Sequence, residues 1–399
     1  MKVRPVGLLV LAHAAADINQ GSIPVLLPFF MAEHHITYTA AAAFVFAVNL
    51  VSTLTQPIFG HIVDRHSRPW LIPAAMLTIG LGVCFAGIAP NYNIGLATLM
   101  LTGLGIAVFH PEGARLMNYL AEEEKATAMS LFGIGGQLGF AIGPIIGTAV
   151  LLSFGLKGVT LLVIPTIIVA ALVMFKLPEL SAGYVTRGGA EGAQTGKKGQ
   201  DLWPAFIYLS SALLGRSVIF YGLNTFLPLF WIDVLHQSKV AGGLALATFL
   251  GSTIVGNFLG GRISDRIGYR MVTIAGFALL SMFLPFFAFV ADATLAILLL
   301  IPIGFMLSAP FGAMVVLGQS YLPNRIGLAS GITLGLAFSF GGLTTPLLGW
   351  VADHHGLRAT IIIVAFLPFL CTGLSLMLPD TGKHLSVSVK KNSADYQEK

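Results

Sequence analysis

The ionisable residues that interrupt long apolar stretches are the first candidates for chemistry in this sequence. His13 and Asp17 are four residues apart, so a helix places them on one face. His110 and Glu112 flank Pro111, which kinks a helix and can turn a neighbouring side chain toward a cavity. Imidazoles and carboxylates in apolar surroundings bind and release protons near neutral pH. We therefore predict that Asp17, Glu112, His110 and His13 take part in proton coupling.

A second set of residues has the chemistry of a substrate site. Arg216 stands alone in an apolar segment, and a buried guanidinium suits an anionic ligand in a low-dielectric cavity. Arg115 follows Glu112 by three residues, and it either joins this site or forms a structural ion pair with that glutamate. Tyr221 and Phe226 lie in the same segment as Arg216 and are candidates to line the apolar part of the site.

The composition indicates which kind of element must carry these side chains. Of the 399 residues, 56% are hydrophobic and only 10% are charged, whereas a soluble domain has about 25% charged residues. Such a chain cannot cover a soluble core with a charged surface, so we expect helices in a membrane. Cys84 and Cys371 lie far apart in apolar runs, which predicts neither a disulfide framework nor a metal site. The sequence also lacks a nucleotide-binding loop and a nucleophile–base pair, so we expect a protein that is not an enzyme.

Twelve segments of the sequence have the length and composition of membrane-spanning helices, each of which needs roughly 20 mostly apolar residues. A polar, glycine-rich linker (179–203) separates the sixth segment from the seventh, and a polar tail (381–399) follows the last. The predicted fold class is therefore an all-α integral membrane protein with twelve transmembrane helices. The segments cover residues 6–31, 38–62, 70–89, 93–118, 126–152, 158–177, 204–231, 240–262, 270–290, 294–320, 326–351 and 358–378.

The basic residues predict the orientation of the chain. If both termini are cytoplasmic, the outer loops carry only Lys157, Lys239 and Arg358, and every other Lys or Arg apart from Arg216 lies on an inner segment. This bias is typical of the cytoplasmic side of a membrane protein. The net charge of +5 therefore indicates membrane orientation and not nucleic-acid binding.

The two halves of the chain repeat one another. Matches such as Pro144 with Pro346 recur in the same order and at a nearly constant offset. The repeat predicts an N-terminal half (1–178) and a C-terminal half (204–380) of six helices each, with a substrate site between them near the middle of the membrane.

The repeat also relates two of the buried charges. It places Arg216 close to the point of the seventh segment that is equivalent to Asp17 in the first. The loop motif described below resembles that of a transporter superfamily in which the first and seventh helices face each other across the cavity. That resemblance implies that Asp17 and Arg216 approach each other, and we expect them to respond to protonation and substrate. The alternative is a static ion pair that only fixes the packing.

A loop motif with the character of a gate occurs once in each half. The motif consists of Gly60, Asp64, Arg65 and Arg68 in the first half and of Gly261, Asp265 and Arg266 in the second. It resembles the signature loop of the major facilitator superfamily. In that architecture Asp64 faces the start of the eleventh helix near Arg325, and Asp265 faces the start of the fifth. We expect these contacts to hold the cytoplasmic side closed; the alternative is a charged turn that only satisfies the positive-inside rule.

A glycine–proline pattern marks the fifth segment. Gly139, Gly143 and Pro144 resemble the motif of the superfamily's proton antiporters. Close packing of small residues explains the same spacing nearly as well. The motif therefore gives only modest support to export.

Several strings point to a narrower resemblance. His13 with Asp17, the string 108–112, and Gly349 with Asp353 resemble the bacterial fosmidomycin resistance proteins, and the similarity extends over all twelve segments. The resemblance implies a monomeric antiporter in the bacterial inner membrane. Such a protein exports a small drug-like anion, a phosphonate, while protons flow inward.

Two other functions fit the same sequence. A proton symporter or facilitator that imports a sugar or an organic acid would have the same fold, because the fold does not set the direction of transport. A membrane receptor or enzyme subunit is a third possibility, which the paired gate loops disfavour. In the transporter readings the partners are protons, a small-molecule substrate and the lipid bilayer, and the proton gradient takes the place of a cofactor.

Overall fold

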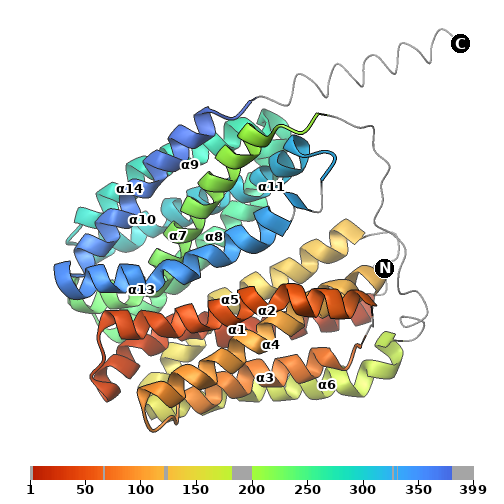
Figure 1. The fold of residues 1–399 in the computed structure, drawn as a ribbon. Coiled ribbons are helices and arrows are strands. Elements are labelled where there is room, and N and C mark those ends of the chain that lie inside the picture. Colours follow the sequence, from red (N-terminus) through yellow and green to blue (C-terminus); the bar gives the residue numbers. More distant parts are fainter. Residues whose placement is uncertain are drawn as a thin grey trace, which may run out of the picture.

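Every regular element in the described part of the chain is a helix (Figure 1). Lipid offers no water to bond the backbone, and a helix pairs these polar groups within one segment. The prediction of an all-α chain is confirmed. The predicted linker between 182 and 199, and the tail from 380 onward, lie outside the described residues. The computed structural model describes residues 3–65, 68–120, 125–181, 200–325, 328–329 and 331–379.

The first half is a bundle of helices in which α1 is central. α1 packs against α5 over much of its length and also contacts α3, α4 and α6. A 3-10 helix, η1 (Leu156–Leu162), leads from α5 into α6. The helices are α1 (Val3–His34), α2 (Tyr38–Arg65), α3 (Leu71–Ala86), α4 (Tyr92–Leu120), α5 (Lys125–Phe154) and α6 (Val163–Ser181).

The second half is a similar bundle in which α7 takes the place of α1. α7 packs against α13, α14 and α8. The helices are α7 (Trp203–Asp233), α8 (Lys239–Ile267), α9 (Tyr269–Phe289), α10 (Ala293–Ser308), α11 (Pro310–Tyr321), α13 (Ala337–His355) and α14 (Leu357–Leu376).

Two of the predicted segments are interrupted. The tenth is divided into α10 and α11 at Ala309, directly before Pro310, which has no amide hydrogen to donate. The eleventh begins with a π-helical turn, η3 (Gly331–Leu336), before α13. With these interruptions counted inside their segments, the described helices correspond to the twelve that the sequence predicts.

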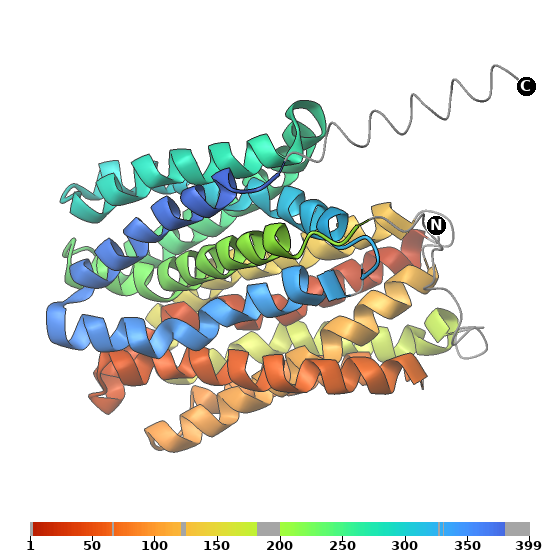
Figure 2. The ribbon, with the colours of Figure 1, turned by 45° about the horizontal axis from the view of Figure 1, so that its top comes forward.

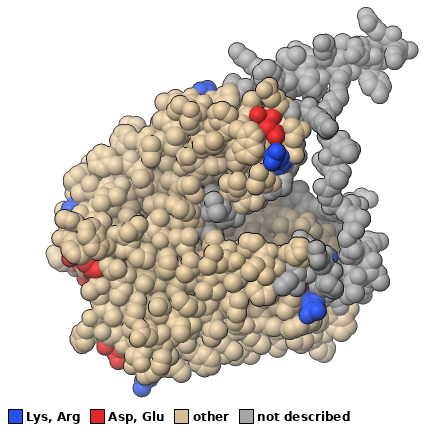
Figure 3. Space-filling model, in the orientation of Figure 1, with Lys and Arg blue, Asp and Glu red and all other residues tan. Residues whose placement is uncertain are grey.

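The surface of the helices is suited to lipid. Nine stretches of the described chain are long and apolar enough to cross a membrane. α1, α3 and α13 are not among them: α3 is shorter, and polar residues in the middle of α1 lower its hydropathy. On the face drawn in Figure 3, charged residues lie near the ends of the helices, and the surface between them is uncharged. The chain is therefore a multi-pass membrane protein.

The two halves meet at one end of the molecule and separate toward the other (Figures 1 and 2). Across the contact, α2 packs against α13 and α5 packs against α8. The halves diverge toward the end at which α1 begins, and Figure 3 shows the hollow between them. We call this the open end. The closed end contains the loop between α1 and α2 and the last turn of α13.

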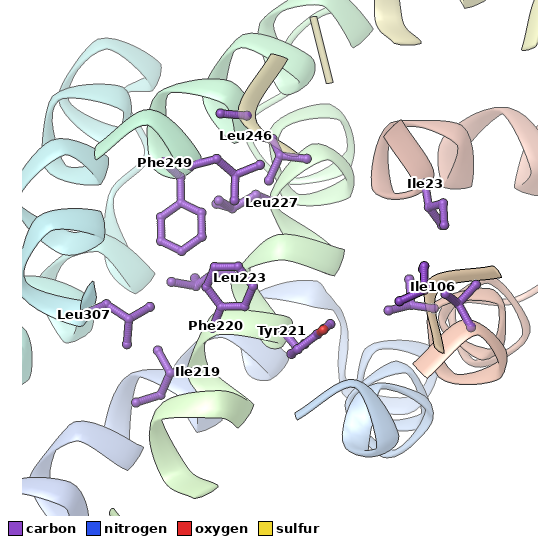
Figure 4. Close-up of a cluster of buried hydrophobic side chains, with 14 of the residues drawn as sticks. Ile23, Ile106, Ile219, Phe220, Tyr221, Leu223, Leu227, Leu246, Phe249 and Leu307 are labelled. Atoms are coloured by element: carbon purple, nitrogen blue, oxygen red, sulfur yellow. The ribbon is translucent and has the colours of Figure 1, made fainter. Parts of the chain in front are cut away.

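Apolar packing in the second half supports one wall of the contact. Figure 4 shows Leu223 and Leu227 of α7 beside Leu246 and Phe249 of α8. All four side chains are buried. Tyr221 lies on the same helix, but its hydroxyl points away from this cluster and toward the first half.

Candidate functional site

A cavity of about 440 Å³ lies between the two halves. Its walls come from α1, α2, α4 and α5 of the first half and from α7, α8, α10 and α11 of the second. A site between two repeats is the arrangement that the sequence predicts. The acidic and basic residues that line it, among those described, are His13, Asp17, His110 and Arg216.

Three of these residues form a compact group, which we call the histidine–aspartate cluster: His13, Asp17 and His110. Nε2 of His13 lies 3.3 Å from Oδ2 of Asp17 and 3.3 Å from Nε2 of His110. Nε2 of His110 lies 4.0 Å from Oδ1 of Asp17. The sequence predicted the pair on α1 from its spacing, and α4 adds the second imidazole.

The backbone fixes the tautomer of both imidazoles. Nδ1 of His13 lies 2.8 Å from the carbonyl oxygen of Phe132, and Nδ1 of His110 lies 3.0 Å from that of Ile106. A carbonyl oxygen can only accept a hydrogen bond, so Nδ1 carries the hydrogen in both rings. In a neutral imidazole Nε2 is then without hydrogen.

The cluster consequently lacks a hydrogen at its centre. Two bare Nε2 atoms and the carboxylate of Asp17 converge, and all of them are acceptors when the rings are neutral. Oδ1 of Asp17 is buried without a hydrogen-bond partner among the described residues. One proton on either Nε2 would turn the opposed acceptors into charge-assisted hydrogen bonds. The three groups lie within 4.8 Å of one another, close enough to share one small cation.

Packing holds this geometry in place. The ring of His13 contacts those of Phe132 and Phe109, at centroid distances of 4.1 and 5.6 Å. Gly136 of α5 faces the cluster, and a Cβ atom there would lie 2.8 Å from Oδ2 of Asp17. The cluster therefore depends on the missing side chain of Gly136 as well as on its own residues.

Arg216 supplies a permanent positive charge on the opposite wall. The side chain is buried, with 5% of its surface exposed. Its Nε donates to the carbonyl oxygen of Leu307 at 2.8 Å, and Nη2 donates to Oγ of Ser308 at 3.4 Å. The ring of Phe311 lies 4.6 Å from its Cζ. These partners sit at the break between α10 and α11, so the interruption of the tenth segment positions the guanidinium.

The predicted contact between Asp17 and Arg216 is not made in this conformation. Both line the cavity, but Asp17 contacts the two histidines and Arg216 contacts α10 and α11. No carboxylate of the described residues lies within ion-pair distance of Arg216. The expectation that the two side chains approach each other is wrong for this state, and the guanidinium is without an anionic partner among the described residues.

Three other candidates lie away from the cavity. Glu112 follows His110 by two residues, and a helix turns by about 200° over that step, so only His110 faces the cavity. Glu112 is instead fully buried and absent from the cavity lining. Arg115 and Phe226 are likewise absent from the lining, and Phe226 is fully buried in the core.

Tyr221 does line the cavity, together with a polar partner that the sequence analysis missed. Its hydroxyl donates to Oδ1 of Asn49 at 2.8 Å, which joins α7 to α2. Asn49, Ser52 and Gln56 form a polar stripe on one face of α2. Their i, i+3, i+7 spacing in an apolar helix was the signal that could have identified them. Other amides in the lining that sequence reasoning missed are Gln20, Gln137 and Asn257.

The gate residues lie apart at the open end. Asp265 accepts from the hydroxyl of Tyr269 within its own half, and Arg325 pairs with Asp201 at 3.6 Å. A Cβ atom at Gly60 or at Gly261 would meet nothing within 4 Å. The contacts of Asp265 and Arg325 both lie within the second half. The side chains of the predicted partners in the first half, Asp64 and the start of the fifth segment, lie outside the described part of the chain, so the gate contacts stay a prediction. Arg68 and Arg266 are exposed, and the side chains of Asp64 and Arg65 lie outside the described part of the chain.

The glycines of the fifth segment have a packing role. A Cβ atom at Gly139 would overlap the backbone of Ala14, and one at Gly143 would lie 2.6 Å from the carbonyl oxygen of Ile18. α5 therefore lies directly against α1, the helix that carries His13 and Asp17. Pro144 lies inside α5 without ending it.

Sequence comparison places this chain beside known transporters. The sequence model of the Major Facilitator Superfamily matches residues 9–345. The uncharacterized MFS-type transporter YfnC of Bacillus subtilis (strain 168) is 31% identical over 394 residues, which cover 96% of this chain and 94% of that protein. The fosmidomycin resistance protein of Escherichia coli (strain K12) is 28% identical over 384 residues, which cover 94% and 92%.

Structural comparison gives the same fold. A bacterial homologue of the human lysosomal transporter Spinster, in an inward-facing and occupied conformation, superposes with a TM-score of 0.79 at 15% identity. The match covers 94% of this chain and 96% of that one. A variant of the nucleoside transporter NupG superposes with a TM-score of 0.71 at 14% identity over 94% and 99% of the two chains.

Proposed function

Because this chain belongs to the Major Facilitator Superfamily, we propose that it is a proton-coupled antiporter that exports a small anionic compound, with fosmidomycin as the first compound to test. One observation carries the proposal. The cavity has a permanent cation on one wall, Arg216, and a proton-binding group on the other, the histidine–aspartate cluster. The likeness to the Escherichia coli fosmidomycin resistance protein supports the choice of compound.

The substrate binds through two kinds of contact. Its anionic group pairs with the guanidinium of Arg216. This guanidinium is buried and has no carboxylate partner among the described residues, so it is well suited to bind an anion. A hydroxyl or N–H group of the substrate donates to the acceptors of the histidine–aspartate cluster. The amides and the aromatic rings of the lining, among them Gln137 and Phe140, hold the rest of the molecule.

The shortage of hydrogen in the cluster couples the substrate to protons. Either a proton or a donor group of the substrate can satisfy the converging acceptors of His13, Asp17 and His110, and both cannot occupy the same place. Substrate binding therefore expels the proton, and proton binding expels the substrate. Mutual exclusion of two ligands at one alternating site is what antiport requires.

The open end is the cytoplasmic end in this proposal. The positive-inside distribution of Lys and Arg supports a cytoplasmic position of both termini, and α1 begins at the open end. The protein works as a monomer in the bacterial inner membrane and uses the proton gradient in place of a cofactor. Asp64, Asp265 and Arg325 close the cytoplasmic end when the halves rock together.

A proton symporter is the second candidate, and one feature favours it. A proton on the cluster adds a positive charge across the cavity from Arg216, which strengthens the attraction of an anion. In a symporter, proton and substrate would bind together and the substrate would be a nutrient such as an organic acid. The two functions predict opposite effects of a proton gradient.

Transport in everted membrane vesicles distinguishes the two functions. In the antiporter, an acidic lumen drives labelled fosmidomycin into the vesicles, and a protonophore abolishes the accumulation. In the symporter, the same gradient drives the labelled compound out of preloaded vesicles. A parallel growth screen of overexpressing and deletion strains against toxic compounds extends the search for the substrate. No change in growth for any compound would favour uptake of a metabolite.

A further inference from the structure

The contact between the halves at the closed end contains two aspartates of the second half that bind one helix of the first. Asp353 lies in the last turn of α13, and Asp233 is the last residue of α7. We propose that these two carboxylates form a latch on the first turn of α2, and that this latch holds the closed end shut until the cavity opens there.

Four hydrogen bonds make up the latch. The backbone amide of Tyr38 donates to Oδ1 of Asp353 at 2.8 Å, and that of Thr39 donates to Oδ2 at 3.0 Å. The hydroxyl of Thr39 donates to the same oxygen at 2.5 Å. The hydroxyl of Tyr38 donates to Oδ2 of Asp233 at 2.8 Å. The first amides of a helix have no partner within it, and the helix dipole favours a negative charge beside them.

Asp353 acts as a carboxylate in this contact. Partial burial tends to raise its pKa, but the hydrogen bonds from Thr39 and Tyr38 outweigh this effect and lower the pKa below its usual value. The bonds are therefore charge-assisted and stronger than those between neutral groups.

Gly349 allows α13 to come close enough for the latch. It lies one helical turn before Asp353, and a Cβ atom there would be 2.8 Å from both Cα of Thr39 and the carbonyl oxygen of Tyr38. The sequence pattern that joins Gly349 to Asp353 thus has a physical explanation, in which one residue makes room and the other binds.

The second contact between the halves is built differently. Where α5 meets α8, Gly243 packs directly against the side chain of Thr148. This contact therefore consists of close packing between the two helices. The hydrogen bonds between described residues of the two halves lie on α2 instead. Deeper along α2 than the latch, the pair Asn49 and Tyr221 and the bond from Thr345 to the carbonyl oxygen of Ala42 also join this helix to the second half. α2 is therefore the helix that must be released when the closed end opens.

Spin-label distances across the closed end test the latch. Labels at Asn93→Cys of α4 and Val240→Cys of α8 report the separation of the halves from exposed positions outside the latch, and both native cysteines are buried. In Asp353→Asn one of the two acceptor oxygens and the charge are lost. We expect the ratio of the long-distance to the short-distance population to rise about tenfold in lipid nanodiscs, since bonds to charged groups are strong.

Asp292→Asn is the matched control. Asp292 also accepts from a helix amide at this end, that of Leu295 at 2.7 Å, but the helix belongs to its own half. The latch predicts no change in the distances for this variant. Equal distributions in Asp353→Asn and Asp292→Asn would overturn the proposal. If Asp353→Asn does not fold, Thr39→Val decides, with a rise of about threefold expected from one lost hydroxyl bond and no rise contradicting the latch.

The proposal rests on alternating access, but its test needs neither substrate nor proton gradient. A failure of the latch leaves antiport intact as a function, because the cavity would then be closed by other contacts. A failure of proton coupling leaves the distance changes of Asp353→Asn unaffected.

Discussion

The two walls of the cavity carry different kinds of charge. On the first half, His13, Asp17 and His110 are proton-binding groups, and no hydrogen lies between their converging acceptor atoms when the rings are neutral. On the second half, Arg216 is always charged and its donors are fixed by the break before Pro310. α1 and α7 occupy equivalent places in the repeat, so the two copies have diverged into a switchable wall and a permanent one. In the proposed function, this difference lets a nearly symmetric fold bind a proton on one wall and an anion on the other.

Asp17→Asn should have the largest effect, because it removes the carboxylate of the switchable wall and keeps its shape. We expect gradient-driven accumulation of fosmidomycin in everted vesicles to fall by at least about a hundredfold, as for the loss of a proton-transfer group. Asp292→Asn, at an exposed helix cap, should transport normally. Normal transport by Asp17→Asn would remove the distinction between the two walls.

Arg216→Gln tests the permanent wall. Loss of the guanidinium should weaken equilibrium binding of fosmidomycin by about 10- to 100-fold at fixed pH, because a charged hydrogen-bond partner is lost. Arg270→Gln is the control, since Arg270 also donates to two backbone carbonyl oxygens but does not line the cavity. Equal losses of affinity in the two variants would mean that Arg216 stabilises the fold and does not bind the substrate.

Gly136→Ala sharpens the comparison by disturbing the switchable wall without changing its charges. The new methyl group would press on Asp17 and His13, and we expect the rate of proton-driven transport to fall about tenfold from this overpacking. Gly133→Ala adds the same methyl group one turn earlier in the cavity wall, where nothing lies within 4 Å. A similar fall in both variants would argue against the role of the cluster geometry.

Phe311→Leu should have the smallest effect. It removes the ring that lies over the guanidinium of Arg216, and a cation–π contact of this kind accounts for about a threefold change in substrate affinity. Phe258→Leu removes the ring beside Arg262, which is outside the cavity, and should leave binding unchanged. No loss of affinity in Phe311→Leu would show that the bonds to Leu307 and Ser308 suffice to place the guanidinium.

The fold followed from the sequence because its signals are carried by many residues. Apolar length, the distribution of basic residues and the repeat that relates Pro144 to Pro346 all act over whole segments, and lipid permits few alternatives to a helix. The interruption at Ala309 and the π-helical turn that begins at Gly331 were not predicted. Proline alone does not identify such a break, because Pro111 and Pro144 lie inside unbroken helices.

The site was only partly predictable. The i, i+4 spacing identified His13 and Asp17 as partners, but no local spacing relates them to His110 of α4. Pro111 did not reveal that His110 faces the cavity and Glu112 does not, since the rotation of a helix about its axis is set by tertiary packing. Asp17 and Arg216 were expected to meet because the repeat relates their positions along the first and seventh helices, but a sequence repeat does not fix the distance between two walls of a cavity.

Counting protons during substrate binding tests the central claim most directly. The purified protein is titrated with fosmidomycin in weakly buffered detergent solution with a pH indicator, and a chelator excludes transition-metal ions, which also bind imidazoles. The account predicts that binding releases protons into solution, and that Asp17→Asn binds the compound without releasing any. Uptake of protons on binding, or binding by the unaltered protein with no release, would contradict it.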